Sequence, residues 1–194
     1  MWRWAGPAVA LMITMVPAQA GVVIHSDPAL DFTIALPGGW VARGTTVDAP
    51  FLATDGVSGL RCALDVESLD DGQEADLLRQ SGEADVRGLL RHWKPAYWFK
   101  VWEGEDVVPS IRSTFAAAMP DGWPKAEAEM DLASIAADRP LHAAGRATLT
   151  IRNGRLYVLL CYLEADSDAA KNKLWMKARS RAAAVLGRFA VWAQ

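Results

Sequence analysis

Three acidic side chains alternate along one short segment, at Glu127, Glu129 and Asp131. On a β-strand, alternate side chains point to the same face, so these carboxylates would form a row. Such a row could bind Ca²⁺ or a basic partner, and paired carboxylates perform acid/base chemistry when burial separates their pKa values. Because Ala128 and Met130 between them belong to the face that looks buried, we predict that the carboxylates form a solvated acidic face.

The remaining patterns associated with catalysis or metal binding are absent from the sequence. His25, His92 and His142 stand far apart, without the close spacing of a zinc or copper site. No Gly-x-Ser-x-Gly, Ser-x-x-Lys or glycine-rich phosphate loop occurs. We therefore expect no enzyme activity, no metal and no cofactor. A hydrolase whose Ser, His and Asp come from distant segments stays open as an alternative, because spacing does not exclude it.

Two cysteines, Cys62 and Cys161, each lie in a segment of alternating apolar residues. Both side chains are therefore expected to face inward. If the two strands are neighbours, a disulfide would close a loop of about 100 residues, which stabilises a fold by roughly 4 to 5 kcal/mol. If they are not neighbours, the cysteines are two buried thiols. The sequence leaves both outcomes open, and a redox-active pair is not expected because there is no Cys-x-x-Cys.

Aromatic and basic residues are concentrated in one stretch of ten positions. The aromatic residues there are Trp93, Tyr97, Trp98, Phe99 and Trp102. If 97–102 is a strand, Trp98, Lys100 and Trp102 share one face. Aromatic side chains beside cations bind partner proteins or sugars. We predict a binding surface formed by Trp93, Trp98, Lys100 and Trp102; the alternative is that Trp98 and Trp102 pack beneath the last helix.

The first twenty residues have the layout of a cleavable secretory signal. Arg3 precedes an apolar run from Ala5 to Val16, and Ala18-Gln19-Ala20 forms a cleavage motif. That run of about 12 residues is short of the roughly 20 needed to span a bilayer. We predict a signal peptide over 1–20, cleavage near Ala20, and one domain over 21–194 in the periplasm or secreted, without a transmembrane segment.

The composition is that of an ordinary globular domain. Of the 194 residues, 52% are hydrophobic and 22% are charged, and the formal net charge is -3. This disfavours a disordered chain, and the acidic balance disfavours a nucleic-acid-binding protein.

Two periodicities divide the chain into strands and helices. Alternation predicts strands over 31–36, 59–68, 97–102, 107–117, 126–136, 143–152 and 155–164. Asn153-Gly154 is a two-residue hairpin turn. Helical spacing predicts one helix over 73–93 and another after Asp166-Ser167-Asp168, with Trp175 through Phe189 on its buried face. We therefore predict an α+β fold with a central, mainly antiparallel sheet flanked by two helices.

The segment Asp31-Phe32-Thr33-Ile34-Ala35-Leu36-Pro37-Gly38-Gly39-Trp40 resembles the start of PsbP-like and DcrB-like proteins, which begin with a strand that ends in a Pro-x-Gly-Trp turn. The hairpin over 147–159 and the terminal helix are similar too, so the resemblance covers about residues 22–192. It implies an α/β/α sandwich of the PsbP-like type and an accessory, assembly or partner-binding role. It implies no catalytic residue and no cofactor.

These observations together predict a non-enzymatic accessory or partner-binding protein of the cell envelope. Its partner would be another envelope protein, and a monomer is compatible with the sequence. The main alternative is a small-ligand or glycan-binding protein that uses the aromatic residues between Trp93 and Trp102.

Overall fold

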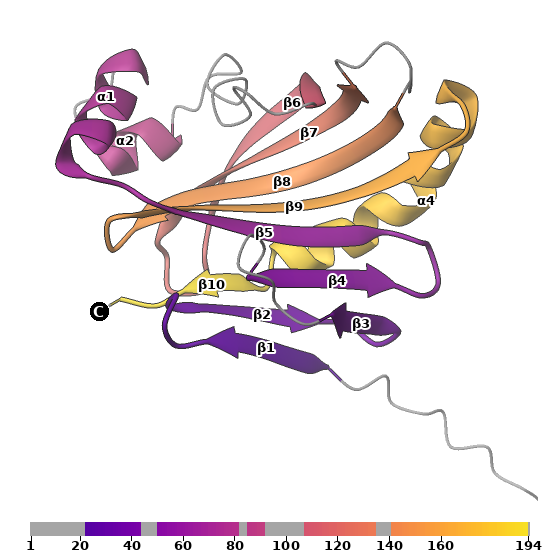
Figure 1. Cartoon of the computed structure of the whole chain (residues 1–194), viewed down its shortest axis with the longest axis horizontal. Helices are drawn as coiled ribbons and strands as arrows, with labels where there is room; N and C mark the ends of the chain where they lie inside the picture. Colours follow the sequence, from indigo (N-terminus) through magenta and orange to yellow (C-terminus); the bar gives the residue numbers. More distant parts are fainter. Residues whose placement is uncertain (1–21, 44–49, 82–84, 92–106, 135–140, 194) are drawn as a thin grey trace, which may run out of the picture.

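The computed structural model describes residues 22–43, 50–81, 85–91, 107–134 and 141–193. Within them the chain forms two antiparallel sheets, with helices packed on the larger one (Figure 1). The elements are β1 (Val23–Asp27), β2 (Phe32–Leu36), β3 (Trp40–Arg43), β4 (Phe51–Asp55), β5 (Arg61–Ser68), α1 (Asp71–Ser81), α2 (Val86–Arg91), β6 (Val107–Ala118), β7 (Pro124–Ser134), β8 (His142–Arg152), β9 (Arg155–Ala165), α4 (Asp168–Leu186) and β10 (Phe189–Val191).

The larger sheet has seven strands in the order β3-β4-β5-β9-β8-β7-β6, all paired antiparallel. Its centre is the hairpin of β8 and β9, in which Arg152 pairs with Arg155. Asn153 and Gly154 both have positive φ, at 54° and 66°, as a two-residue hairpin turn requires. The hairpin, the α+β class and the mainly antiparallel pairing are thus confirmed.

The predicted single central sheet is wrong, because β2 belongs to a second sheet of three strands, β1-β2-β10. The two sheets nevertheless share one interior: Phe32 and Ile34 of β2 are buried in the same cluster as Tyr157 and Leu159 of β9. Alternation in a sequence shows which face of a strand is buried. It does not show which strand is its hydrogen-bonded neighbour.

Phe189 is not on the terminal helix, as its helical spacing suggested, but in β10. Helix α4 ends at Leu186, and Gly187 follows as its C-cap. Phe189 then pairs with Ile34 and Val191 pairs with Phe32. The chain therefore changes from helical to extended structure within three residues, and its apolar side chains stay in the same core.

The single helix predicted over 73–93 is also wrong, because the structure has two shorter helices there. At the start of α1, Asp70 and Gln73 form a reciprocal capping box: Asp70 Oδ1 accepts from the Gln73 amide at 2.7 Å, and Gln73 Oε1 accepts from the Asp70 amide at 2.8 Å. Asp85 then caps α2 by accepting from the amides of Arg87 and Gly88. A second N-cap marks the start of a second helix.

The two faces of the larger sheet are buried in two separate cores. One lies between this sheet, the smaller sheet and α4, and includes Phe32, Tyr157 and Trp175. The other lies beneath α1 and α2, and includes Leu90, Met130 and Leu149. Helix α4 and the pair α1 and α2 therefore lie on opposite sides of the larger sheet (Figure 1).

Cys62 and Cys161 form a disulfide, which settles the alternative that the sequence left open. The two residues are direct cross-strand partners in β5 and β9, and their Cα atoms are 4.0 Å apart. Both are at most 1% exposed. The bond joins residues 99 positions apart, so it removes much of the freedom of the unfolded chain.

Replacing both cysteines by alanine should lower the free energy of unfolding by about 4 kcal/mol, since the loop is long and the site is buried. Denaturant unfolding with and without a reductant measures this. The Cys62→Ala/Cys161→Ala variant serves as the control, because reductant should leave its midpoint unchanged. Equal stability of the native and double-alanine proteins would show that the bond does not stabilise the fold.

Candidate functional site

The acidic row of β7 faces helix α4 and not solvent, so the predicted solvated face is wrong. Glu127 is only 5% exposed, and Glu129 and Asp131 are half-buried. The residues between them are buried on the opposite face, in the core beneath α2. Strand β7 is thus covered on both sides. Alternation of acidic and apolar residues did not reveal this, because the covering helix lies about 40 residues later in the chain.

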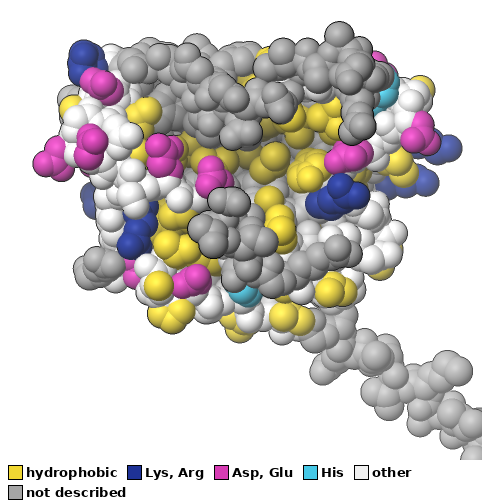
Figure 2. Space-filling model, viewed as in Figure 1, with side chains coloured by type: hydrophobic (Ala, Val, Ile, Leu, Met, Phe, Trp, Pro, Cys, Tyr) yellow, Lys and Arg dark blue, Asp and Glu magenta, His cyan; other side chains and the backbone are white. Residues whose placement is uncertain are grey.

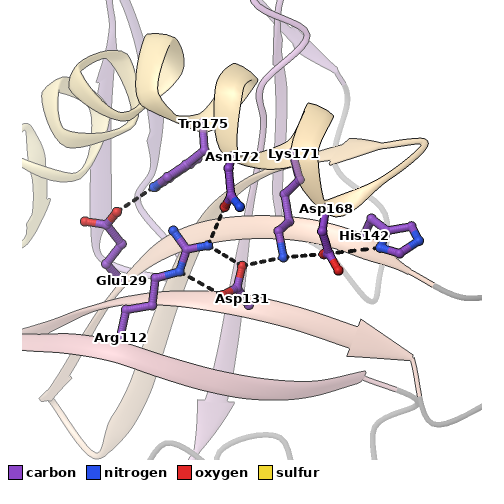
Figure 3. A network of polar contacts seen from close by, with 8 residues as sticks. All are labelled: Arg112, Glu129, Asp131, His142, Asp168, Lys171, Asn172 and Trp175. Atoms are coloured by element: carbon purple, nitrogen blue, oxygen red, sulfur yellow. Dashed lines mark hydrogen bonds and ion pairs between the residues drawn. The ribbon is translucent and has the colours of Figure 1, made fainter.

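Asp131 is the centre of a polar network beneath the first turns of α4 (Figure 3). Arg112 donates two hydrogen bonds to its carboxylate, at 2.7 and 2.6 Å. The ammonium of Lys171 lies 2.7 Å from Asp131 Oδ1. Arg112 also donates to Asn172 Oδ1 at 2.9 Å. Strand β6, strand β7 and helix α4 are therefore joined at one carboxylate.

The network extends from Lys171 to the start of α4 and to β8. Lys171 lies 2.8 Å from Asp168 Oδ1, and the same oxygen is 3.3 Å from Nδ1 of His142. One turn further along the helix, Trp175 donates its indole N–H to Glu129 at 2.5 Å. Figure 3 shows these side chains meeting between the sheet and the helix. Both β7 carboxylates in the view are thus engaged by donors from α4.

Arg112 reaches this position through an irregularity of strand β6. The register between β6 and β7 shifts between Ile111 and Ser113, so Arg112 is the extra residue of a β-bulge. A bulge redirects the side chain of its extra residue. Arg112 could not be predicted from the sequence, since nothing in the local alternation marks the bulge.

A second charged cluster surrounds Glu127. Arg146 donates to its carboxylate at 2.6 and 3.0 Å, and Lys125 lies 3.1 Å away. Lys125 also donates to the carbonyl of Leu186 at 2.6 Å, at the C-terminal end of α4. The guanidinium of Arg146 lies over the ring of Phe115 at 4.9 Å. A cation at a helix C-terminus is stabilised by the carbonyl groups there, so Lys125 anchors this end of α4.

The charges around Asp131 stabilise its ionised form. Burial alone would raise the pKa of Asp131, but hydrogen bonds from Arg112 and Lys171 outweigh burial and hold the pKa below its ordinary value. Burial would likewise lower the pKa of Lys171, but Asp131 and Asp168 raise it. Both groups therefore keep their charge around neutral pH. A general acid or base needs a pKa near the working pH, so this arrangement fits structural ion pairs better than proton transfer.

Helix α4 is also tied to strand β4, near the other edge of the larger sheet, at Asp55. This carboxylate is fully buried, and Arg181 donates to it at 2.5 and 2.7 Å. Ser58 and the amide of Val57 donate to it as well. Burial would raise the pKa of Asp55, but these hydrogen bonds, first that of Arg181, lower it. This pair could not be predicted from the sequence, because 126 positions separate its members.

The described histidines are not placed together. His142 begins β8 and lies near Asp168 at the start of α4, whereas His25 lies in β1 with its ring 5.2 Å from that of Phe51. His92 is outside the described residues. In the part of the chain that the structure describes, no three His, Cys, Asp or Glu side chains gather as metal ligands.

On the opposite face of the larger sheet, the region over β3, β4, β5 and β9 makes no substantial contact with α1 or α2, the helices described on that face. We call this region the open sheet face. Strand register places its side chains in two cross-strand rows. One row runs through Val41, Thr54, Arg61 and Tyr162, and the other through Leu52, Ala63 and Leu160. Helix α2 packs on β6 and β7, at the other end of this face. The open sheet face therefore has an apolar centre that reaches an edge strand.

A hollow of about 410 Å³ lies on the open sheet face and is lined by Leu52, Ala53, Thr54, Arg61, Cys62, Ala63 and Tyr162. Arg61 pairs with Glu164 at 3.3 Å at its border. Next to Tyr162 across the sheet stands Gly145, where a Cβ atom would come within 3.2 Å of Tyr162. Figure 2 shows hydrophobic side chains gathered over β5 and β9, with charged side chains on either side.

The binding surface predicted from the aromatic segment lies outside the described residues. Trp93, Trp98, Lys100 and Trp102 all fall between the end of α2 at Arg91 and the start of β6 at Val107. The same holds for the strand predicted over 97–102. These assignments stay predictions.

The chain matches no family model, and no curated protein is similar in sequence. Solved structures do resemble it. The cyanobacterial PsbP protein (CyanoP) of Synechocystis has a TM-score of 0.53 at 14% identity, over 96% of this chain and 98% of that one. The Ran-binding protein Mog1p of Saccharomyces cerevisiae has a TM-score of 0.55 at 10% identity, over 90% and 97%. The chain thus has the PsbP-like fold, as the resemblance in its sequence implied.

Within the described residues, no helix has the length and apolar character needed to cross a bilayer. Helix α4, the longest of them, has 19 residues, of which Lys171, Lys173, Lys177, Arg179 and Arg181 are cations.

Replacing Asp131 by asparagine should lower the free energy of unfolding at pH 7 by about 2 kcal/mol, because Arg112 and Lys171 lose their common anion. The native pKa of Asp131 is lowered, so its contribution is present above the unfolded-state pKa and is lost as the pH falls through the folded-state pKa. Denaturant unfolding at pH 7 and near pH 3 measures both effects, and the difference between the proteins should shrink in acid.

The matched control is Asp76→Asn, which breaks the exposed pair of Asp76 with Arg79 in α1. Exposed pairs contribute little, so this change should cost less than about 0.5 kcal/mol. Similar losses in the two variants would contradict the special role of Asp131.

Proposed function

We propose that this protein is a non-enzymatic accessory protein outside the cytoplasm, which binds a partner protein of the cell envelope through its open sheet face. The observation that carries this proposal is the hollow over β4, β5 and β9. Its centre is apolar and its border is polar, with Arg61 and Glu164 exposed. Protein interfaces combine such a centre with such a rim.

The charged groups favour binding over catalysis. Each carboxylate beneath α4 is engaged by a donor: Glu127 by Arg146, Glu129 by Trp175, and Asp131 by Arg112. A catalytic carboxylate would need a pKa near neutral, whereas the pKa of Asp131 is lowered. These groups hold the helix in place, and the hollow is on the other face of the sheet.

The disulfide supports a location outside the cytoplasm, since such bonds form and persist in oxidising compartments. The signal peptide predicted over 1–20 supports the same location. We propose the periplasm or secretion, with a domain that starts near Gly21.

A second candidate function is the binding of a small ligand or glycan. The hollow of about 410 Å³ falls within the range of ligand sites, about 300 to 1,000 Å³. Thr54, Arg61 and Tyr162 supply polar groups along its wall. This candidate predicts that cell-wall fragments change the intrinsic tryptophan fluorescence during titration, whereas a protein-docking face predicts no response.

A photo-crosslinking residue in place of Ala63, in the hollow, should capture an envelope protein in intact cells. The same residue in place of Met176 should not, because that side chain is 61% exposed on α4, on the other side of the sheet. Introducing a charge by Leu52→Arg should reduce the adduct at position 63 about tenfold or more, since a buried charge opposes an apolar contact.

The unfolding midpoint of Leu52→Arg should stay close to that of the native protein, because Leu52 is half-buried at an open face. Equal adducts from positions 63 and 176, or an adduct that survives Leu52→Arg in a folded protein, would contradict docking on the open sheet face.

We further propose that the aromatic segment contributes to partner binding through Trp93, Trp98, Lys100 and Trp102. The Trp98→Ala/Trp102→Ala variant should then lose most of the adduct from position 63 and keep its stability. If these side chains pack in a core, the variant should instead lose about 3 to 5 kcal/mol per tryptophan in unfolding free energy. Denaturant unfolding, run beside the crosslinking, separates the two outcomes.

A further inference from the structure

Helix α4 and the residues just after it form a basic region on an acidic protein. Six cations and no acidic residue occur between positions 171 and 188: Lys171, Lys173, Lys177, Arg179, Arg181 and Arg188. The whole chain has a net charge of -3, so the rest of it carries -3 minus 6, which is -9. Positive charge is therefore concentrated on one helix.

Two of these cations face inward and have partners. Lys171 pairs with Asp131 and Asp168, and Arg181 pairs with Asp55. The other four are exposed. No ion pair between described residues involves them; they are Lys173, Lys177, Arg179 and Arg188. Their charge is available to an external partner.

Two of the four exposed cations share the outermost side of the helix, and a third follows the helix. Arg188 lies in the turn after α4 ends at Leu186, whereas Lys173 and Lys177 are one turn apart on the helix. This side is opposite to the buried residues Trp175 and Ala182. We call these three residues the α4 ridge.

We propose that the α4 ridge docks the protein on an anionic membrane surface, through the phosphates of lipid headgroups. The charge of the ridge is complementary to such a surface, which attracts nearby lysine and arginine side chains. Two cations of the ridge lie on the outer side of a helix that packs on a sheet, and the third is exposed in the turn after that helix. An extended surface of phosphates can contact several exposed cations at once.

Two exposed apolar side chains flank the ridge, as a membrane interface would favour. Leu174 is 42% exposed and Met176 is 61% exposed. The two are about 160° apart around the helix, one on each side of Lys173 and Lys177. Apolar side chains beside lysines add to the attraction of a helix for a bilayer surface. A highly charged soluble partner would offer Leu174 and Met176 less apolar surface to contact.

The opposite placement of α4 and the open sheet face gives the docking a geometric consequence. The core beneath α4 and the core beneath α2 lie on different faces of the larger sheet. A protein attached through the α4 ridge therefore turns its hollow away from the lipid. Docking would orient the molecule, and it does not depend on what occupies the hollow.

The test is the partitioning of the full chain onto two kinds of vesicles, phosphatidylglycerol mixed with phosphatidylcholine and phosphatidylcholine alone, measured by sedimentation at low and high salt. We expect binding to the anionic vesicles that exceeds binding to the neutral vesicles and falls as salt rises. The Lys173→Gln/Lys177→Gln variant should lower the anionic-over-neutral ratio about tenfold or more. Both lysines are exposed, so its melting temperature should not change.

The matched control is Arg79→Gln/Arg87→Gln, which removes the same charge from exposed sites on α1 and α2. It should change the ratio less than about twofold, because its side chains are not on α4. The apolar residues at the amino-terminal end are the same in all variants, so they do not affect the comparison. Equal binding to the two kinds of vesicle, or equal losses of the anionic-over-neutral ratio in both variants, would overturn the proposal. Retention on immobilised polyglutamate without a preference for anionic vesicles would also overturn it, and would assign the ridge to an acidic protein.

Discussion

The fold depends on fixing helix α4 to the larger sheet by charged side chains that are largely removed from water. Its first turns are held at Asp131, its last turn at Lys125, and its flank at Asp55. Burying a charge is costly unless a partner and hydrogen bonds compensate for it, so each of these groups constrains the helix to one position. Apolar contacts such as those of Ala178 and Ala182 are less directional, because small side chains pack in several registers.

The position of α4 also determines how the two sheets meet. The chain leaves the helix at Gly187, and Phe189 and Val191 then pair with β2. The smaller sheet is joined to the hairpin of the larger one by Arg155, which pairs with Asp31. Tyr157 strengthens this junction by donating to the carbonyl of Leu30 at 3.1 Å. A helix held by charges thus places the strand that closes the shared core.

The sequence predicted the elements well where one local periodicity determines the structure. It predicted poorly the features that depend on contacts between distant elements. The β8-β9 hairpin follows from Asn153-Gly154, whose turn geometry is local. The predicted solvation of Glu129 and Asp131 was wrong because their donors, such as Trp175 and Lys171, come from α4. The bulge at Arg112 could not be predicted, because it arises from the register of β6 against β7 and local alternation does not mark it. The pairing of Cys62 with Cys161 could not be predicted, because it depends on the order of strands in the sheet.

The disulfide connects the stability of the sheet with the surface that we propose for binding. Cys62 lies between Arg61 and Ala63 in β5, so its side chain points inward directly beneath the hollow. The bond holds β5 to β9, and these two strands supply most of the open sheet face. A surface that is already ordered loses little conformational entropy when a partner binds. The disulfide and the charged contacts of α4 therefore order the sheet whose other face we propose as the docking surface.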